Sequence, residues 1–166
     1  LHDAYSAGFP NAQFTVWSRT RANAETFAQE RDATVADDLE RAVRSADIIT
    51  SATMSTQPVL RGEWLQAGQH VDLIGAYRPD MREADDVALQ RARVFVDSFD
   101  TTIGHIGEVQ IPLESGAISR DHLIADYYSE GGFERRSNDE ITLFKNGGGA
   151  HLDLMVSRYV LDRYEV

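Results

Sequence analysis

The stretch DIITSAT, residues 47–53, is a compact run rich in β-branched residues that ends in small polar residues, with Pro58 beyond it. Two more short apolar runs follow along the chain: VDLI at 71–74, which ends at Gly75, and VFV at 94–96. Helical stretches separate these runs, and none of them shows a clean alternation of polar and apolar residues. Such runs are typical of parallel strands buried on both faces. They predict a doubly wound α/β fold with a parallel sheet, at least up to Asp97.

The residues before this stretch extend the pattern toward the N-terminus. Residues 1–7 resemble the end of a helix that stops at Gly8, with Pro10 just beyond it. Residues 13–17 suit a short strand. Two amphipathic helices then follow, because apolar positions recur at helical spacing. Their faces are Ala24, Phe27, Ala28 and Arg31 for the first helix, and Leu39, Ala42, Val43 and Ala46 for the second.

The pattern changes after Asp97. The sequence predicts a polar helix over 99–108, and then a helix that begins at Ser119, runs through Tyr127 and ends at a pair of glycines, 131–132. A strand or extended segment is expected at 140–145, followed by three glycines and a final helix. That helix carries an apolar stripe that needs a partner surface: Leu152, Met155, Val156, Tyr159 and Val160.

Composition and charge limit the function classes. With 166 residues, of which 42% are hydrophobic and 26% charged, the chain is typical of a soluble globular domain. The formal net charge of −11 excludes a broad nucleic-acid-binding surface, but it leaves room for a local site that binds one small anion. Cysteine is absent, so disulfides, thiolate metal sites and cysteine nucleophiles are excluded.

Targeting signals are also lacking in this sequence. No apolar run approaches the roughly 18 residues needed to cross a membrane. Neither a basic nor an apolar signal region follows Leu1. We therefore expect a cytoplasmic protein without nucleic-acid or membrane partners, and a chain that begins inside an element, without its natural N-terminus.

The residues just after the strands are the candidates for ligand binding, because ligands of such sheets lie beyond the carboxyl ends of the strands. Ser18, Arg19 and Thr20 follow the first strand, where NAD-specific folds place an Asp or Glu on the ribose 2′-hydroxyl. Two hydroxyls and a guanidinium instead suit a 2′-phosphate, which favours NADP(H). The alternative is a polar loop in which Thr20 only caps a helix.

Three further segments admit two interpretations each. Thr53, Met54 and Ser55 either line a nicotinamide or are simply the polar end of a strand. The segment 75–79 either lets the backbone approach a ligand, with Tyr77 facing a substrate ring, or is a glycine turn. The glycines at 147–149 either present N–H groups to an anion or form a flexible joint. The Gly-x-Gly-x-x-Gly fingerprint is absent, and we expect it just upstream of Leu1.

Other clusters predict no chemistry. His105 and Glu108, and likewise His122 and Asp126, have spacings that share a helix face, but neither pair has an evident third ligand, so no metal site is predicted. The serines at 51 and 55 have no adjacent histidine, which gives a hydrolase triad no support. The acidic residues at 83, 85 and 86 are expected to form a solvated helix start.

Taken together, five segments resemble the ornithine cyclodeaminase/mu-crystallin family in order and spacing. They are VWSRT (16–20) followed by Asn23, ADIITSATMSTQPVL (46–60), GEWLQAGQHVDLIGAYRPDMREAD (62–85), VFVDS (94–98) and DEITLFKNGGGAHLD (139–153). The resemblance covers nearly the whole chain. A single segment would be a weak signal, whereas five in order are specific.

The resemblance implies a Rossmann domain inserted in a chain about twice this length. Residues 1–145 would be a partial NADP-binding domain, incomplete at its N-terminal edge, and 146–166 a helix that returns to a missing substrate and dimerisation domain. A homodimer is implied. The implied cofactor-binding residues are Ser18, Arg19, Thr20, Asn23, Thr53, Met54, Ile74, Ala76 and Asn146, and the implied substrate-facing residues are Tyr77 and Gly147.

One departure separates the family's activities. Ornithine cyclodeaminases place an Asp at the Tyr77 position, and a tyrosine, with an unperturbed pKa of about 10, cannot replace that base at neutral pH. The surrounding GAYRPDMRE is instead similar to the ketimine reductases. Asn146 stands where many members have Ser. The resemblance thus implies NADPH-dependent reduction of 1-pyrroline-2-carboxylate or 1-piperideine-2-carboxylate to L-proline or L-pipecolate.

The resemblance leaves the catalytic residues outside this chain. The family supplies the Arg or Lys that binds the substrate carboxylate from its N-terminal domain, so the 166 residues alone are expected to be inactive. Three alternatives stay open: an ornithine cyclodeaminase or amino-acid dehydrogenase activity, a non-catalytic protein that binds a small ligand as mu-crystallin does, and a truncated product without catalysis.

Overall fold

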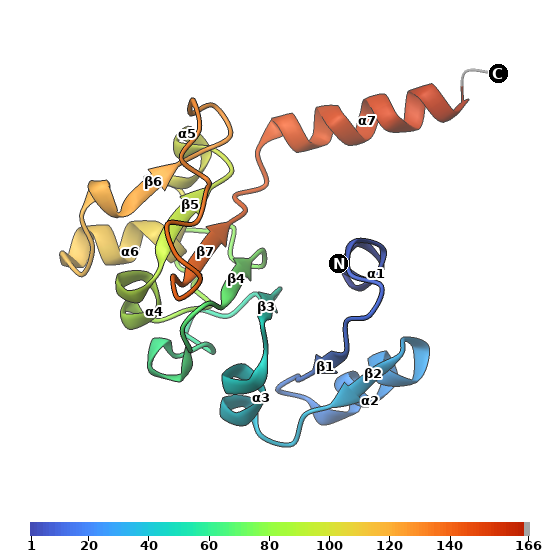
Figure 1. Ribbon diagram of the computed structural model, residues 1–166. Helices are drawn as coiled ribbons and strands as arrows, with labels where there is room; N and C mark the ends of the chain where they lie inside the picture. Colours follow the sequence, from blue (N-terminus) through green and yellow to red (C-terminus); the bar gives the residue numbers. More distant parts are fainter. Residues whose placement is uncertain (165–166) are drawn as a thin grey trace. The chain divides into compact units, whose positions relative to one another are not determined.

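The computed structural model describes residues 1–164, which form two units. The first unit covers residues 1–45 and the second begins at Ala46 (Figure 1). Each unit is described by itself. Residues 165 and 166 of the predicted final helix lie outside the described part of the chain.

The first unit pairs two short parallel strands. Its elements are α1 (His2–Gly8), β1 (Phe14–Val16), α2 (Arg21–Glu30), β2 (Ala33–Val35) and α3 (Leu39–Ser45). The predicted helix end at Gly8, the strand and both amphipathic helices are confirmed. The sequence did not reveal β2, because ATV is only three residues long and follows α2 directly. It pairs with β1 from Phe14 opposite Ala33 to Val16 opposite Val35.

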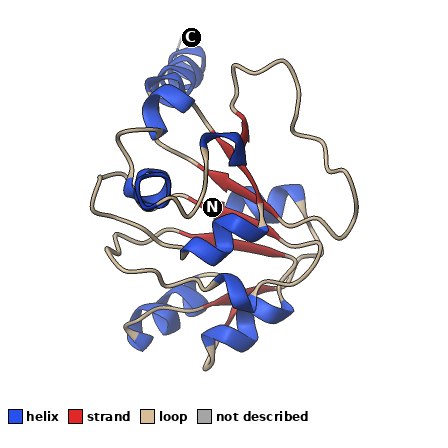
Figure 2. Ribbon diagram, turned by 90° about the vertical axis from the view of Figure 1, so that its left-hand side faces the viewer, coloured by secondary structure: helices blue, strands red, loops and turns tan. Residues whose placement is uncertain are grey.

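The second unit is built on a parallel sheet of five strands in the order β3-β4-β7-β5-β6. The strands are β3 (Ile48–Ser51), β4 (His70–Leu73), β5 (Arg93–Val96), β6 (Leu123–Ala125) and β7 (Thr142–Lys145). Figure 2, where strands are red, shows them side by side. The predicted parallel α/β fold is confirmed, as are the strands expected near 47–53, 71–74, 94–96 and 140–145. The chain order did not reveal that β7 inserts between β4 and β5.

Helices and helical turns connect these strands. They are η1 (Gly62–Trp64), α4 (Asp86–Arg91), α5 (Phe99–Thr102), α6 (Gly107–Ser115), η2 (Arg120–His122) and α7 (Ala150–Tyr164). One face of the central strands is apolar and fully buried, and its side chains are those of Val71, Leu73, Val94, Val96 and Leu143. The opposite face is polar and half-buried in β4, at His70 and Asp72. This apolar face forms the core of the unit. Burial in β4 alternates between half-buried and buried residues, so the expectation that this strand is buried on both faces is wrong.

Two predicted helices are wrong. The helix expected over 99–108 is two helices, α5 and α6, because Gly104 between them has a φ of +79° that no helix continues through. The helix expected from Ser119 to Tyr127 is only the turn η2, followed by β6. Leu123 and Ala125 are buried while Ile124 between them is exposed, so the burial alternates as in a strand. The glycines at 131–132 lie in a loop.

The final helix α7 is present, and none of its described residues is buried. Its large apolar side chains face solvent within the described part of the chain; those of Leu154, Met155, Val156, Tyr159, Val160 and Leu161 are all exposed. Among residues 1–164, no helix combines the length and the apolar character needed to cross a bilayer.

The acidic segment before α4 is only partly the solvated helix start that was expected. Asp85 is the N-cap of α4, and its Oδ1 accepts hydrogen bonds from the N–H groups of Ala88 (2.9 Å) and Gly62 (2.8 Å). Glu83, in contrast, is completely buried. A buried carboxylate must accept hydrogen bonds from donors within the protein, so Glu83 is not part of the solvated helix start.

We expect Asp85→Ala to lower the free energy of unfolding by about 2 kcal/mol, because the helix loses its cap and the half-buried N–H of Gly62 loses its acceptor. Asp85→Asn keeps an acceptor oxygen and should cost less than half of that. Urea unfolding of the three proteins measures both values. Equal stability of Asp85→Ala and the unmodified protein would contradict this account of the cap.

Candidate functional site

The strands of the second unit end at one common edge. Ser51, Leu73 and Lys145 are in register at the ends of β3, β4 and β7, and Val96 of β5 is opposite Lys145. Backbone hydrogen bonds continue one residue further: Ile74 N–H donates to Ser51 O (2.9 Å), Asn146 N–H to Leu73 O (3.0 Å) and Asp97 N–H to Lys145 O (3.1 Å). The loops that leave these strands therefore start side by side, at the edge where sheets of this type bind ligands.

These loops contain most of the residues predicted to bind the nicotinamide end of the cofactor. Thr53 and Ile74 are half-buried, whereas the side chains of Met54 and Tyr77 are 72% and 57% exposed at the surface. Ala76 is fully buried with Met81 and Ile106. The side chains of Tyr77 and Met54 are therefore accessible at this edge of the sheet, whereas that of Ala76 is not.

The glycine-rich loop after β7 packs closely on Asp97. A Cβ at Gly147 would lie 2.9 Å from Asp97 Oδ1 and from Thr102 Oγ1, so only glycine fits there without a shift. Gly149 N–H donates to Asp97 Oδ2 at 3.3 Å, and Asn146 Oδ1 accepts from Gly148 N–H at 2.8 Å. The loop is thus held by specific hydrogen bonds at the carboxyl edge of the sheet, where the loops after β3 and β4 also begin.

The sequence analysis missed two polar residues at this edge. Asp97 is fully buried directly after β5, and the imidazole Nε2 of His151 lies 3.9 Å from its Oδ2. The position of Asp97 directly after the VFV strand was the signal that could have identified it. His151 gives no such signal, because only the fold of the glycine loop brings it to Asp97.

The other predicted cofactor residues lie in the first unit. Ser18, Arg19 and Thr20 follow β1, and Thr20 is the N-cap of α2, as the alternative interpretation expected, but its side chain makes no capping hydrogen bond. Arg21 is paired with Glu25 and Asp37. Within residues 1–164 Arg19 makes no hydrogen bond or ion pair, and it is exposed together with Asn23. The guanidinium of Arg19 is therefore available for an external anion.

The pairs considered for metal binding have other partners. The Glu108 carboxylate accepts hydrogen bonds from the N–H groups of Glu83 (2.6 Å) and Ala84 (2.9 Å). Asp126 accepts from Phe99 N–H (3.0 Å), and it shares no helix with His122. Over residues 1–164 no group of three potential metal ligands is present.

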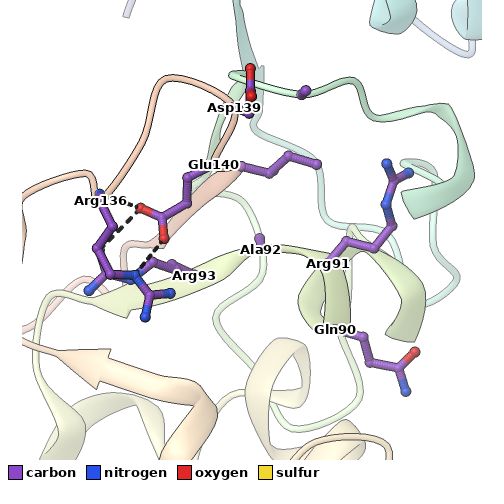
Figure 3. A pocket seen from close by; sticks show the side chains of 9 residues that line it. Gln90, Arg91, Ala92, Arg93, Arg136, Asp139 and Glu140 are labelled. Atoms are coloured by element: carbon purple, nitrogen blue, oxygen red, sulfur yellow. Dashed lines mark hydrogen bonds and ion pairs between the residues drawn. The ribbon is translucent and has the colours of Figure 1, made fainter.

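A hollow opens at the opposite end of the sheet, beside the starts of β5 and β7 (Figure 3). The Glu140 carboxylate in it receives hydrogen bonds from Arg93 (3.2 Å) and Arg136 (2.9 Å). Burial would raise the pKa of Glu140, but the hydrogen bonds from Arg136 and Arg93 lower it to about 2. Arg93 and Arg136 share the Glu140 carboxylate, and Arg91 donates to the carbonyl of Gly62. Because each of these arginines already has a partner within the protein, we assign this hollow a structural role.

Buried charges lie beneath the carboxyl edge. Lys145 is fully buried at the end of β7, and its Nζ donates to Leu73 O at 3.2 Å. Burial lowers the pKa of Lys145, and the surrounding carboxylates, Glu108 and Glu83 first among them, oppose that effect. Burial also raises the pKa of Glu108 to about 7, against two backbone N–H donors and Lys145. The carboxyl edge thus rests on charges that water does not reach.

The family model of the ornithine cyclodeaminase/mu-crystallin family matches residues 2–166. The chain belongs to this family. The resemblance seen in the five segments is thereby confirmed.

Individual relatives carry reductase names. The chain is 49% identical to a Delta(1)-pyrroline-2-carboxylate reductase of Paracoccus denitrificans, over 95% of this chain and 52% of the relative. It is 34% identical to the ketimine reductase mu-crystallin of Mus musculus, over 98% of this chain and 51% of the relative. The chain therefore spans about half the length of the curated relatives it matches.

A solved structure shares the fold. The Delta(1)-pyrroline-2-carboxylate reductase of Thermococcus litoralis, solved in complex with NADH and L-proline, superimposes with a TM-score of 0.82 at 28% identity. The match covers 87% of this chain and 47% of that one. The Rossmann-like fold class predicted from the sequence is confirmed.

We expect Glu108 to make stability fall as the pH rises. A folded pKa of about 7, above the ordinary 4.5, adds stability that is complete below pH 4.5 and lost as the pH rises through 7. Between pH 5 and pH 8 the unmodified protein should lose on the order of 2 kcal/mol that Glu108→Gln does not lose. Urea unfolding of both proteins at the two pH values gives this difference, and parallel pH dependences would refute the assignment.

Proposed function

We propose that this chain is the cofactor-binding half of an NADPH-dependent reductase of cyclic imino acids, which converts 1-pyrroline-2-carboxylate or 1-piperideine-2-carboxylate to L-proline or L-pipecolate. One observation carries the proposal: Tyr77, an exposed neutral side chain, lies in the loop after β4, at the edge of the sheet where ligands bind. A phenol at this position favours reduction over deamination, which requires a carboxylate base. The reductase names of the relatives support the same chemistry.

Each unit, taken by itself, offers residues that suit one end of a dinucleotide. On the adenosine side, the unpaired guanidinium of Arg19 and the hydroxyls of Ser18 and Thr20 match a 2′-phosphate, and Asn23 is exposed next to them. On the nicotinamide side, a Cβ at Gly75 would collide with the backbone of Thr53, so the two loops approach as closely as the backbone allows. We assign the floor of the nicotinamide site to these two loops, with Ile74, Ala76 and Asn146.

The chain's own residues orient the reactants. A reduced nicotinamide, when bound, supplies the hydride that is transferred to the imine carbon. Met54 and Tyr77 are exposed beside its proposed position and would cover the substrate ring. Gly147 packs closely on Asp97 and Thr102, so it would face the substrate through its backbone. The group that binds the substrate carboxylate is proposed to lie in the part of the relatives that this chain does not match.

The last helix fits this organisation. We propose residues 1–145 as the cofactor domain and 146–166 as a helix that docks on a substrate and dimerisation domain, in a homodimer. The exposed apolar side chains of α7 support the docking. A cytoplasmic location stays a prediction.

We expect the full-length protein to oxidise NADPH when 1-pyrroline-2-carboxylate or 1-piperideine-2-carboxylate is supplied, and the 166-residue chain alone to be inactive. Loss of absorbance at 340 nm and chromatography of the product measure the reaction. No oxidation with either imine would refute the reductase. Release of ammonia from ornithine would show a cyclodeaminase instead, and binding of a small ligand without turnover would show a binding protein.

Arg19→Ala should raise the KM for NADPH about tenfold or more, because a charge-assisted contact to the 2′-phosphate is lost. The KM for NADH, which lacks this phosphate, should change less than twofold. Arg44→Ala is the matched control, since Arg44 is an exposed arginine of the same unit that is paired with Glu40. A preference for NADH that Arg19→Ala leaves unchanged would overturn the assignment to NADP(H).

A further inference from the structure

One buried carboxylate links the two loops of the proposed nicotinamide site. Oε1 of Glu83 accepts hydrogen bonds from Ser51 Oγ (2.7 Å) and Thr53 N–H (2.5 Å), at the end of β3. Its Oε2 accepts from Gly75 N–H (2.7 Å) and Ala76 N–H (3.2 Å), just after β4. Each oxygen therefore serves one loop, and the carbon between the oxygens fixes the distance between the loops.

Glu83 is itself held firmly in place. Its N–H donates to Glu108 Oε2 at 2.6 Å, and its carbonyl accepts from the N–H groups of Val59 and Leu60, both at 2.8 Å. Glu108 also binds the next N–H, that of Ala84. Both carboxylates are fully buried. The backbone of Glu83, which belongs to the loop after β4, is thus held by Glu108 of α6 and by Val59 and Leu60, further along the loop after β3.

A carboxylate is the group that this position requires. Four donors converge on two oxygens, and an ionised carboxylate accepts about four hydrogen bonds. Glutamine has one acceptor oxygen. Its NH₂ group is a donor and would face the N–H donors of one of the loops. At least one buried N–H would then lose its acceptor, which either costs stability or displaces the loop. Buried Lys145 supplies the balancing positive charge nearby.

From this geometry we propose that Glu83 is a positioning residue for hydride transfer, because its carboxylate sets the spacing of the loops after β3 and β4 and so the floor of the nicotinamide site. This role rests on the proposed reductase function. Glu83 touches neither ligand. The hydrogen bonds of Glu83 lie within the second unit. Its substitution should therefore disturb the nicotinamide end of the cofactor site, and should leave binding at the adenosine end, at Ser18 to Asn23, unchanged.

The first experiment tests the bracing itself by hydrogen–deuterium exchange of the full-length protein and its Glu83→Gln variant. Peptides that span 52–56 and 74–78 should exchange at least tenfold faster in the variant, while peptides from the central strands β5 and β7 keep their rates. This readout needs no catalysis, so it holds even if the enzyme proves to act on another substrate. Unchanged exchange in both loops would overturn the proposal.

The second experiment tests the consequence for the reaction. Because a small misplacement of reacting atoms is costly, Glu83→Gln should lower kcat for imine reduction by about tenfold to a hundredfold. Its affinity for 2′,5′-ADP, which occupies only the adenosine end, should stay within twofold. If Glu83 had a purely structural role, its substitution would lower both kcat and the affinity for 2′,5′-ADP. An unchanged kcat in a variant whose loops exchange faster would refute the positioning role.

Glu140→Gln is the matched control. Glu140 is also a well-bonded carboxylate of the same unit, but it lies at the opposite end of the sheet, where it pairs with Arg93 and Arg136. Its substitution should change neither kcat nor exchange in the two loops. If the unmodified protein reduces neither imine, the proposed function fails, and the exchange experiment alone then decides whether Glu83 braces the loops.

Discussion

A carboxylate that is removed from water must find donors inside the protein, and this requirement organises the carboxyl edge of the sheet. Glu83 satisfies it with N–H groups from two loops that have no regular secondary structure of their own. Glu108 satisfies the same requirement with the N–H groups of Glu83 and Ala84. Each carboxylate thus orders a piece of backbone. The pieces that Glu83 orders carry proposed nicotinamide contacts, and Glu108 in turn holds Glu83 in place.

The strand register makes this arrangement possible. Because β7 inserts between β4 and β5, Lys145 reaches the same level as the last residues of β3 and β4. Its ammonium is buried under the loops, and burial lowers its pKa while Glu108 and Glu83 raise it. A strand at the edge of the sheet could not place a cation there. The central position of β7 in the sheet therefore places the positive charge of Lys145 near the carboxylates of Glu83 and Glu108, beneath the proposed site.

Much of this was predictable from residue patterns, and the failures have physical reasons. Short runs rich in Val, Ile and Leu identified β3, β4 and β5, although burial in β4 alternates, because His70 and Asp72 are only half-buried. The segment around Leu123 was misread as a helix, because three residues are too few to separate a period of 2 from a period of 3.6. Glu83 was taken for a solvated residue, since nothing local distinguishes an acid that caps a helix from one that turns inward. Its donors come from Thr53 and Gly75, and only the fold brings them close.

Net charge is a poor guide to whether such a chain can bind a polyanionic dinucleotide. Residues 1–45, which contain Arg19, have seven acidic and five basic side chains, so most of the net charge of −11 belongs to the second unit. Electrostatic fields at physiological salt decay within about 8 Å, so a bound phosphate responds chiefly to its immediate neighbours. Of the two arginines after β1, Arg21 is already neutralised by Glu25 and Asp37. Arg19 has no such partner among residues 1–164, so it is the arginine that we assign to the proposed 2′-phosphate.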